Sequence, residues 1–129
     1  MISLLDPRRV GPHTVVGVTG EIDIATAPVL RDNLLALVNR GAESLVVDLR
    51  GVTFIDSTGV GSLLRIFHRQ GLLGGSVHYV ADQPSLRRVF DLMQLTKRLH
   101  LTDTVADVDL CCPSIQAAEE MELPRTATR

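Results

Sequence analysis

The chain alternates short runs rich in β-branched residues with longer segments in which apolar residues recur at helical spacing. The N-terminal residues 1–23 hold two short strand-like runs, separated by proline and glycine. Strand-like runs follow at residues 44–49, 76–81 and 98–101, and helix-like segments at residues 26–41, 60–71, 82–95 and from 102 onward. Because successive parallel strands are joined through helices, this order predicts an α/β fold. We expect a small, mixed and largely parallel β-sheet packed with about four α-helices.

Capping signals indicate where the helices begin and end. Thr26 is expected to be the N-cap of the first helix, and Gly41 to lie at its C-terminal cap. Asp82 is expected to cap the third helix, with Pro84 in the first turn. Apolar residues at helical spacing then predict the buried face of that helix: Leu86, Phe90 and Met93.

The composition is that of a globular protein with a single core. The chain has 129 residues, of which 45% are hydrophobic and 22% are charged. A formal net charge of -2, without a block of lysine or arginine, argues against direct binding of nucleic acid. No apolar run is long enough to span a bilayer, and the N-terminus does not have the pattern of a secretory signal.

Two adjacent cysteines lie close to the end of the predicted domain. A disulfide between neighbouring residues is strained, so Cys111 and Cys112 are expected to be inert free thiols in a reducing compartment. Sensing of oxidation by this pair is the less favoured alternative. We therefore expect a cytoplasmic protein with one domain over residues 1–112. Residues 113–129 contain proline, charges and small residues, and are expected to form a flexible C-terminal tail.

The sequence contains none of the common catalytic or metal-binding patterns. Four histidines are scattered along it: His13, His68, His78 and His100. Their spacing argues against a metal site and favours structural or solvent-facing roles. The glycine-bearing turns lack the P-loop lysine and the G-x-G-x-x-G pattern, and Ser57 lacks the first glycine of a nucleophile elbow. We therefore predict a protein that is not an enzyme and has no cofactor of its own.

The stretch "FIDSTGVGSLL", residues 54–64, connects an apolar run to the second helix. One interpretation is structural: Asp56 or Ser57 caps the free backbone N–H groups of the first turn. The other is regulatory, with Ser57 as a phosphorylation site at the positive end of the helix. Gly59 and Gly61 are costly in a helix, and we expect them to let another surface approach the helix start closely.

Four segments together resemble the STAS-domain anti-sigma factor antagonists of bacteria. They are, in order, "TGEID", "TAPVLRDNL", "VVDLRGVTFIDSTGVGSLL" and "PSLRRVFDLMQLTKRLHLTDTVADV". The resemblance spans residues 2 to 110 and implies a STAS fold. It departs from the family at Gln94, because related chains often have glycine in the turn after the third helix.

The resemblance implies a regulatory cycle. In this family the unphosphorylated antagonist binds an anti-sigma factor, which is an ATP-dependent serine kinase, and the sigma factor is released. Phosphorylation of the serine in the D-S-[ST]-G motif, here Ser57, switches binding off, and a PP2C-type phosphatase restores the antagonist. ATP and magnesium belong to the kinase. We expect a monomer, with no direct contact to nucleic acid or membrane.

The resemblance and the expected fold also suggest which residues contact the partner. Glu21 and Asp23 would lie beside the serine, although a solvated turn explains them equally well. Gly61, Ser62 and Arg65 are expected to face away from the apolar stripe of the second helix, as an ordinary solvent-facing surface would. The full set of expected contact residues is Glu21, Asp23, Asp56, Thr58, Gly59, Gly61, Ser62 and Arg65.

Two alternative functions remain open from the sequence. The first is an accessory STAS subunit of a membrane lipid or anion transporter, in which the domain serves assembly. Such modules can lack the acceptor serine, so the presence of Ser57 counts against this hypothesis. The second is a scaffold subunit of a large stress-sensing complex built from STAS domains. Those subunits usually carry further domains, whereas this sequence has only a short tail.

Overall fold

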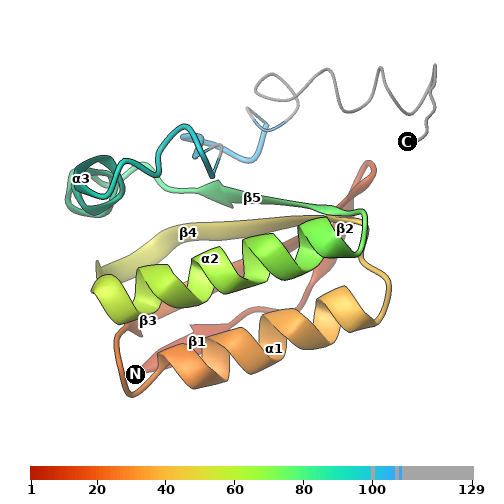
Figure 1. Ribbon diagram of the computed structural model, residues 1–129, viewed down its shortest axis with the longest axis horizontal. Coiled ribbons are helices and arrows are strands. Elements are labelled where there is room, and N and C mark those ends of the chain that lie inside the picture. Colours follow the sequence, from red (N-terminus) through yellow and green to blue (C-terminus); the bar gives the residue numbers. More distant parts are fainter. Residues whose placement is uncertain (100, 107, 109–129) are drawn as a thin grey trace.

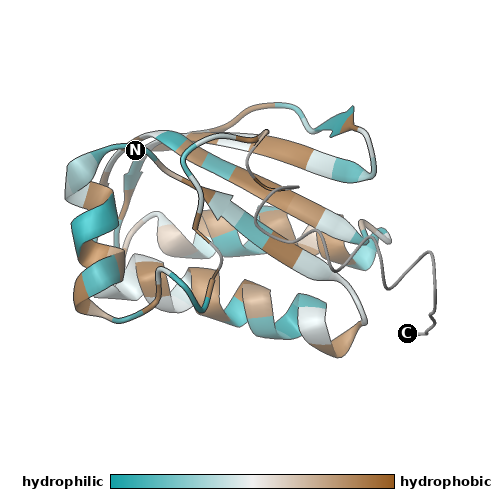
Figure 2. Ribbon diagram, turned by 90° about the horizontal axis from the view of Figure 1, so that it is seen from above, coloured by the Kyte–Doolittle hydropathy of each residue, from teal (hydrophilic) through white to brown (hydrophobic). Residues whose placement is uncertain are grey.

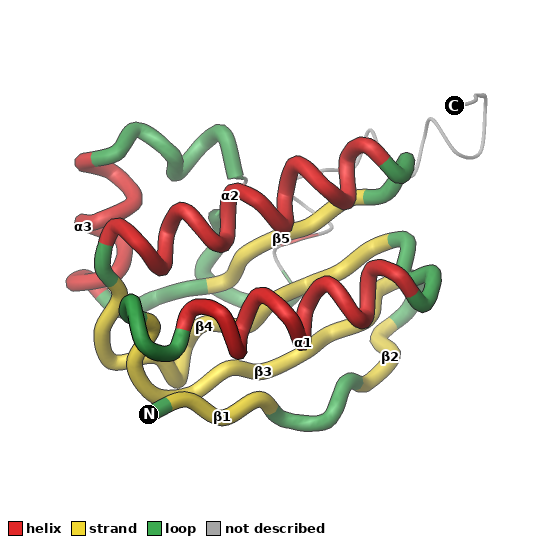
Figure 3. The backbone as a smooth tube through the Cα atoms, turned by 60° about the horizontal axis from the view of Figure 1, so that its bottom comes forward, coloured by secondary structure: helices red, strands yellow, loops and turns green. Residues whose placement is uncertain are grey.

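A five-stranded β-sheet forms the centre of the computed structural model, which describes residues 1–99, 101–106 and 108. Helices α1 and α2 lie side by side on one face of the sheet, and α3 lies near one end of it (Figures 1 and 3). The strands are β1 (Ile2–Leu4), β2 (Arg8–Val10), β3 (His13–Ile22), β4 (Ser44–Ile55) and β5 (Ser76–Val80). The helices are α1 (Ala27–Asn39), α2 (Ser57–Leu72) and α3 (Pro84–Leu92).

The strand order is β1-β3-β4-β5, and β2 also pairs with β3. Strands β1 and β2 run antiparallel to β3, whereas the pairs β3–β4 and β4–β5 are parallel. The parallel pairs are joined through α1 and α2. The register pairs Ile22 with Ile55, so β3 and β4 end side by side. The turns that lead into α1 and α2 therefore lie next to each other, and the predicted mixed α/β sheet is confirmed.

Two apolar clusters cover the two faces of this sheet. The larger contains Leu30 and Leu34 of α1 and Leu63 and Ile66 of α2, all fully buried against the strands. The smaller cluster contains Val15, Val46, Val80 and Val108. Adjacent strand residues point to opposite faces, so Val15 and Val16 belong to different clusters. Figure 2 shows hydrophobic residues along the central strands, while α1 and α2 carry both kinds of residue.

All three helices end with a left-handed residue after the C-cap. The residue is Gly41 after α1, with φ of 95°, and Gly74 after α2, with φ of 84°. After α3 it is Gln94, with φ of 58°. The Leu95 N–H then donates to the Phe90 carbonyl at 2.8 Å, as in a Schellman motif. The glycine that the resemblance leads us to expect at this turn would have a physical reason, because Gln94 is strained in a conformation that glycine adopts freely.

We predict that Gln94→Gly stabilises the protein by about 1 kcal/mol, because glycine adopts the left-handed conformation without the Cβ penalty. Urea unfolding followed by circular dichroism measures this change. Gln94→Ala is the matched control and should leave the free energy of unfolding nearly unchanged, since alanine keeps the Cβ. Equal stability of the glycine and alanine variants would contradict the argument.

The start of α3 differs from the prediction. Gln83, not Asp82, is the N-cap residue, and neither side chain caps the helix. The Gln83 amide instead donates to the carbonyls of Leu49, at 2.8 Å, and Val52, at 2.6 Å, and so ties the helix to β4. Met93 is also not a core residue: it is 40% exposed, because it lies at the C-cap beyond the last helical turn.

The predicted strand at residues 98–101 is wrong in its described part. Leu99 and Leu101 are buried through a series of turns, so their apolar character reflects burial rather than strand pairing. Only an isolated bridge follows, between Thr102 and Val80. The N-terminal segment contains three strands rather than the two expected.

The part of the chain that the structure describes contains three helices, whereas about four were expected. In the segment predicted as the start of a fourth helix, residues 102–106 form a bridge, bends and a turn, whereas Val108 is helical. His100, Cys111, Cys112 and the predicted tail, 113–129, lie outside the described residues.

Candidate functional site

The first turn of α2 is held by Asp56. Its carboxylate accepts a hydrogen bond from the Gly59 N–H at 2.9 Å, and its own N–H donates to the Ile22 carbonyl at 3.2 Å. Asp56 is the N-cap residue and Ser57 is the first helical residue. Of the two capping side chains that the sequence allowed, the structure selects Asp56.

Ser57 therefore has no capping role. Its side chain is exposed, and no hydrogen bond joins its hydroxyl to any residue that the structure describes. The hydroxyl lies at the N-terminus of a 16-residue helix, where the macrodipole favours negative charge. A phosphoryl group could be added to this hydroxyl without breaking a hydrogen bond of the described fold.

The two glycines of the motif have different surroundings. A Cβ on Gly59 would lie 2.7 Å from Cγ2 of Ile22 and 2.8 Å from Cγ1 of Ile55, closer than side chains tolerate. The surface that approaches Gly59 is thus the end of the protein's own β3 and β4, which corrects the expectation of a contact with another molecule. Gly61 has open space around the Cβ position, and its contact with another molecule stays a prediction.

We predict that Gly59→Ala destabilises the protein by about 1 to 3 kcal/mol, because the added methyl group overlaps with Ile22 and Ile55. Gly61→Ala is the matched control on the same helix. It should stabilise the protein by about 0.5 to 1 kcal/mol, because alanine is the better helix former and meets no obstacle. Thermal unfolding of both variants measures the difference, and similar melting temperatures would contradict the assignment of Gly59 to packing.

The turn between β3 and α1 is organised by Asp23. Its carboxylate accepts hydrogen bonds from the N–H groups of Ala25, at 2.9 Å, and Thr26, at 3.0 Å. Thr26 is the N-cap residue as predicted, but its side chain does not cap the helix and donates to the Glu21 carbonyl at 2.6 Å. Hydrogen bonds led by the one from the Thr26 backbone lower the pKa of Asp23. Asp23 thus has a structural role, while the Glu21 side chain is exposed.

Because the pKa of Asp23 is lowered by folding, its contribution to stability is present above the unfolded-state pKa and is lost as the pH falls through the folded value. We predict that Asp23→Asn, which keeps an oxygen acceptor but does not titrate, loses less stability than the wild type below about pH 4. Urea unfolding between neutral and acid pH measures both curves. Parallel curves for the two proteins would contradict this role.

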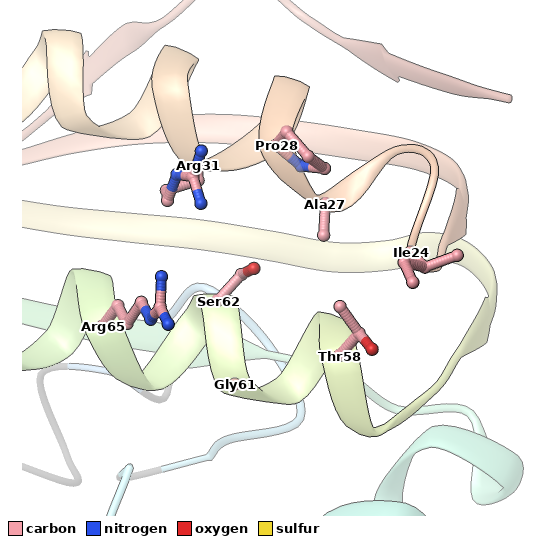
Figure 4. A pocket seen from close by; sticks show the side chains of 8 residues that line it. All are labelled: Ile24, Ala27, Pro28, Arg31, Thr58, Gly61, Ser62 and Arg65. Carbon is pink, nitrogen blue, oxygen red and sulfur yellow. The ribbon is translucent and has the colours of Figure 1, made fainter.

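A groove of about 330 Å³ runs between α1 and α2 beside this turn (Figure 4). It is lined by Ile24, Ala27, Pro28, Arg31, Thr58, Gly61, Ser62 and Arg65. The four α2 residues of this set were predicted as contact residues. Ser62 does not face away from the core, however: it is only 7% exposed, because α1 packs beside it.

Sequence patterns did not identify the α1 side of the groove. The available signal was Ile24, an apolar residue in a polar turn, which is 74% exposed in the structure. Arg31, Ala27 and Pro28 belong to a segment that reads only as a helix start, and nothing local in the sequence shows that α2 lies beside it.

Other chemistry is not evident in the described part of the chain. His13 and His78 are brought together by the sheet, with ring centroids 6.1 Å apart, and His13 Nδ1 lies 2.6 Å from the Ser44 hydroxyl oxygen. Both histidines are buried, as a structural role requires. Among the described residues no group of three or more histidine, cysteine, aspartate or glutamate side chains could hold a metal ion. None of the described helices combines the length and the apolar character needed to cross a membrane.

Comparison with protein families identifies the fold. Residues 5–108 match the STAS domain, and the chain belongs to this family. It is similar to the anti-sigma-B factor antagonist of Bacillus subtilis, with 39% identity over 80 residues, which cover 62% of this chain and 72% of that relative.

Solved structures agree with this assignment. An anti-sigma factor antagonist from Mycobacterium paratuberculosis is 31% identical, with a TM-score of 0.77 over 90% of this chain and 95% of that one. The Bacillus cell fate determinant SpoIIAA, in its phosphorylated form, is 20% identical with a TM-score of 0.62 over 85% of this chain and 96% of that one. At 20% identity, the similarity to SpoIIAA supports the assignment of the fold and nothing further.

Proposed function

We propose that this protein is an anti-sigma factor antagonist controlled by phosphorylation at Ser57. In the unphosphorylated form it binds an anti-sigma factor serine kinase, and the sigma factor held by that kinase is released. The observation that carries the proposal is the exposed Ser57 hydroxyl, unbonded within the described fold, at the N-terminus of α2. The similarity to antagonists at 39% and 31% identity supports the same function.

Phosphorylation at Ser57 suits a switch of binding rather than of folding. The Ser57 oxygen would attack the γ-phosphorus of ATP on the kinase, ADP would leave, and the hydroxyl proton would pass to a base of the kinase. The product adds a charge of about -1.5 to -2 at neutral pH. The positive end of α2 tolerates this charge, and Asp56 still caps the helix. The domain stays folded, while the surface around Ser57 that would face the partner gains negative charge.

The remaining partners follow from this cycle. A PP2C-type phosphatase would remove the phosphoryl group, and ATP and magnesium would be supplied by the kinase. In this proposal four residues of the predicted set contact the kinase: Glu21, Thr58, Gly61 and Arg65. The exposure of Glu21, Thr58 and Arg65 and the open space at Gly61 support this. In this proposal the protein acts in the cytoplasm as a monomer, with one domain over residues 1–112, and catalyses no reaction.

The transporter alternative is less well supported. That alternative predicts a STAS module in which Ser57 serves only as a helix cap. In the structure Asp56 caps the helix, and Ser57 is exposed. The two relatives described above that exceed 30% identity are named as antagonists of anti-sigma factors.

The test compares Ser57→Ala, Ser57→Glu and Thr58→Ala with the wild type. We expect the wild type to capture an ATP-binding kinase from the cytosol of the source organism, and the kinase to phosphorylate wild type and Thr58→Ala. Ser57→Ala should bind but resist phosphorylation, and Ser57→Glu should bind poorly. All three should melt within a few degrees of the wild type, since surface changes of this kind cost about 0.5 kcal/mol or less.

Two results would contradict the proposal. Phosphorylation of Ser57→Ala at the wild-type rate would show that the phosphoacceptor is another residue. Capture of transporter subunits from solubilised membranes, equally by wild type and Ser57→Glu, would favour the transporter alternative.

A further inference from the structure

The groove between α1 and α2 is rich in hydrogen-bond donors. Two guanidinium groups enter it from opposite helices, Arg31 from α1 and Arg65 from α2 (Figure 4). The hydroxyls of Thr58 and Ser62 line the same groove, and none of the lining residues is acidic. A ligand that offers acceptors with negative charge would complement this lining.

The two arginines have few acceptors within the described structure. Arg65 forms no ion pair or hydrogen bond with any residue that the structure describes. Arg31 has one described ion-pair partner, its neighbour Asp32, with a long Nε–Oδ1 distance of 3.6 Å and an Asp32 side chain that is 73% exposed.

Ser62 is the independent observation that points to a ligand. The residue is only 7% exposed, and its hydroxyl has no hydrogen bond to a described residue. Nearly all buried polar groups in proteins have a partner, so an unpaired buried hydroxyl at the wall of a groove indicates a site for an external acceptor.

The other end of the groove is apolar and adjoins the phosphorylation site. Ile24 is 74% exposed there, next to Ala27 and Pro28. Thr58 lines the groove and directly follows Ser57, so an occupant of the groove would lie close to the acceptor serine. A molecule held here would therefore be exposed to the charge of phosphorylated Ser57.

We propose that this groove binds an aspartate or glutamate side chain of the anti-sigma factor kinase. The carboxylate lies between Arg31 and Arg65 and accepts from Ser62, and an apolar neighbour of that residue packs against Ile24. This inference rests on the proposed function and names the chemistry of its partner. It also gives the switch a mechanism, because an acidic segment attracted by the two arginines is repelled by a phosphate on Ser57 at the other end of the same groove.

The experiment measures binding of the full chain to the purified kinase by calorimetry, with Arg31→Gln, Arg65→Gln and Arg65→Glu variants. Arg69→Gln is the matched control, because Arg69 is exposed on the same helix but does not line the groove. We expect each glutamine variant in the groove to weaken binding at least about tenfold, Arg65→Glu to weaken it further, and the control to stay within about twofold. Circular dichroism verifies that each variant is folded.

A charge exchange then tests the identity of the occupant. Single Asp→Arg or Glu→Arg substitutions on the kinase should include one that weakens binding to the wild type and restores binding to Arg65→Glu. Unchanged affinity of Arg31→Gln and Arg65→Gln, or an equal loss in Arg69→Gln, would overturn the inference while leaving the proposed function standing. A change of oligomeric state in Arg65→Glu would assign the groove to a second copy of this chain and overturn it as well. A wild type that neither binds the kinase nor is phosphorylated would overturn the proposed function itself.

Discussion

The parallel pairing of β3 with β4 is the constraint on which the rest of the site depends. Because Ile22 lies beside Ile55 at the ends of these strands, the turns into α1 and α2 start from neighbouring positions. The Asp56 N–H bonds to the Ile22 carbonyl, and the backbone of Gly59 packs directly on both isoleucines. The first turn of α2 is therefore held against the sheet through backbone contacts, and its outer side is left open.

This arrangement separates the groups that maintain the fold from the group that can be modified. Asp23 accepts from two N–H groups in the turn before α1, and Asp56 accepts from the Gly59 N–H in the first turn of α2. Ser57 lies between the cap and the helix body without a hydrogen bond to a described residue. A charge added there meets the positive end of a helix that is already capped, so the added charge acts on a partner more than on the fold.

The groove extends this surface from the serine to α1. Helix α1 contributes Arg31 and the exposed Ile24, and α2 contributes Arg65 and the buried Ser62. Each helix alone presents an ordinary amphipathic surface. Because the two helices lie side by side on one face of the sheet, their hydrogen-bond donors line one groove without an acidic residue. This positively charged groove extends from the phosphorylation site proposed at Ser57.

The sequence by itself determined the α/β alternation, most helix limits and the position of the D-S-T-G stretch at a helix start, because periodicity and capping are local properties. The resemblance to the family added that glycine is expected where this chain has Gln94, and the left-handed conformation of that residue supplies the reason. The residues around 98–101 were misassigned as a strand, since an apolar run shows burial without showing a pairing partner. Only the tertiary structure decided that Asp56 caps the helix instead of Ser57, that Gly59 contacts its own sheet, and that Ser62 faces α1. These three outcomes depend on which distant segment lies beside the start of α2. The parallel register of β3 and β4 determines this, because it pairs Ile22 with Ile55, more than thirty residues further along the chain.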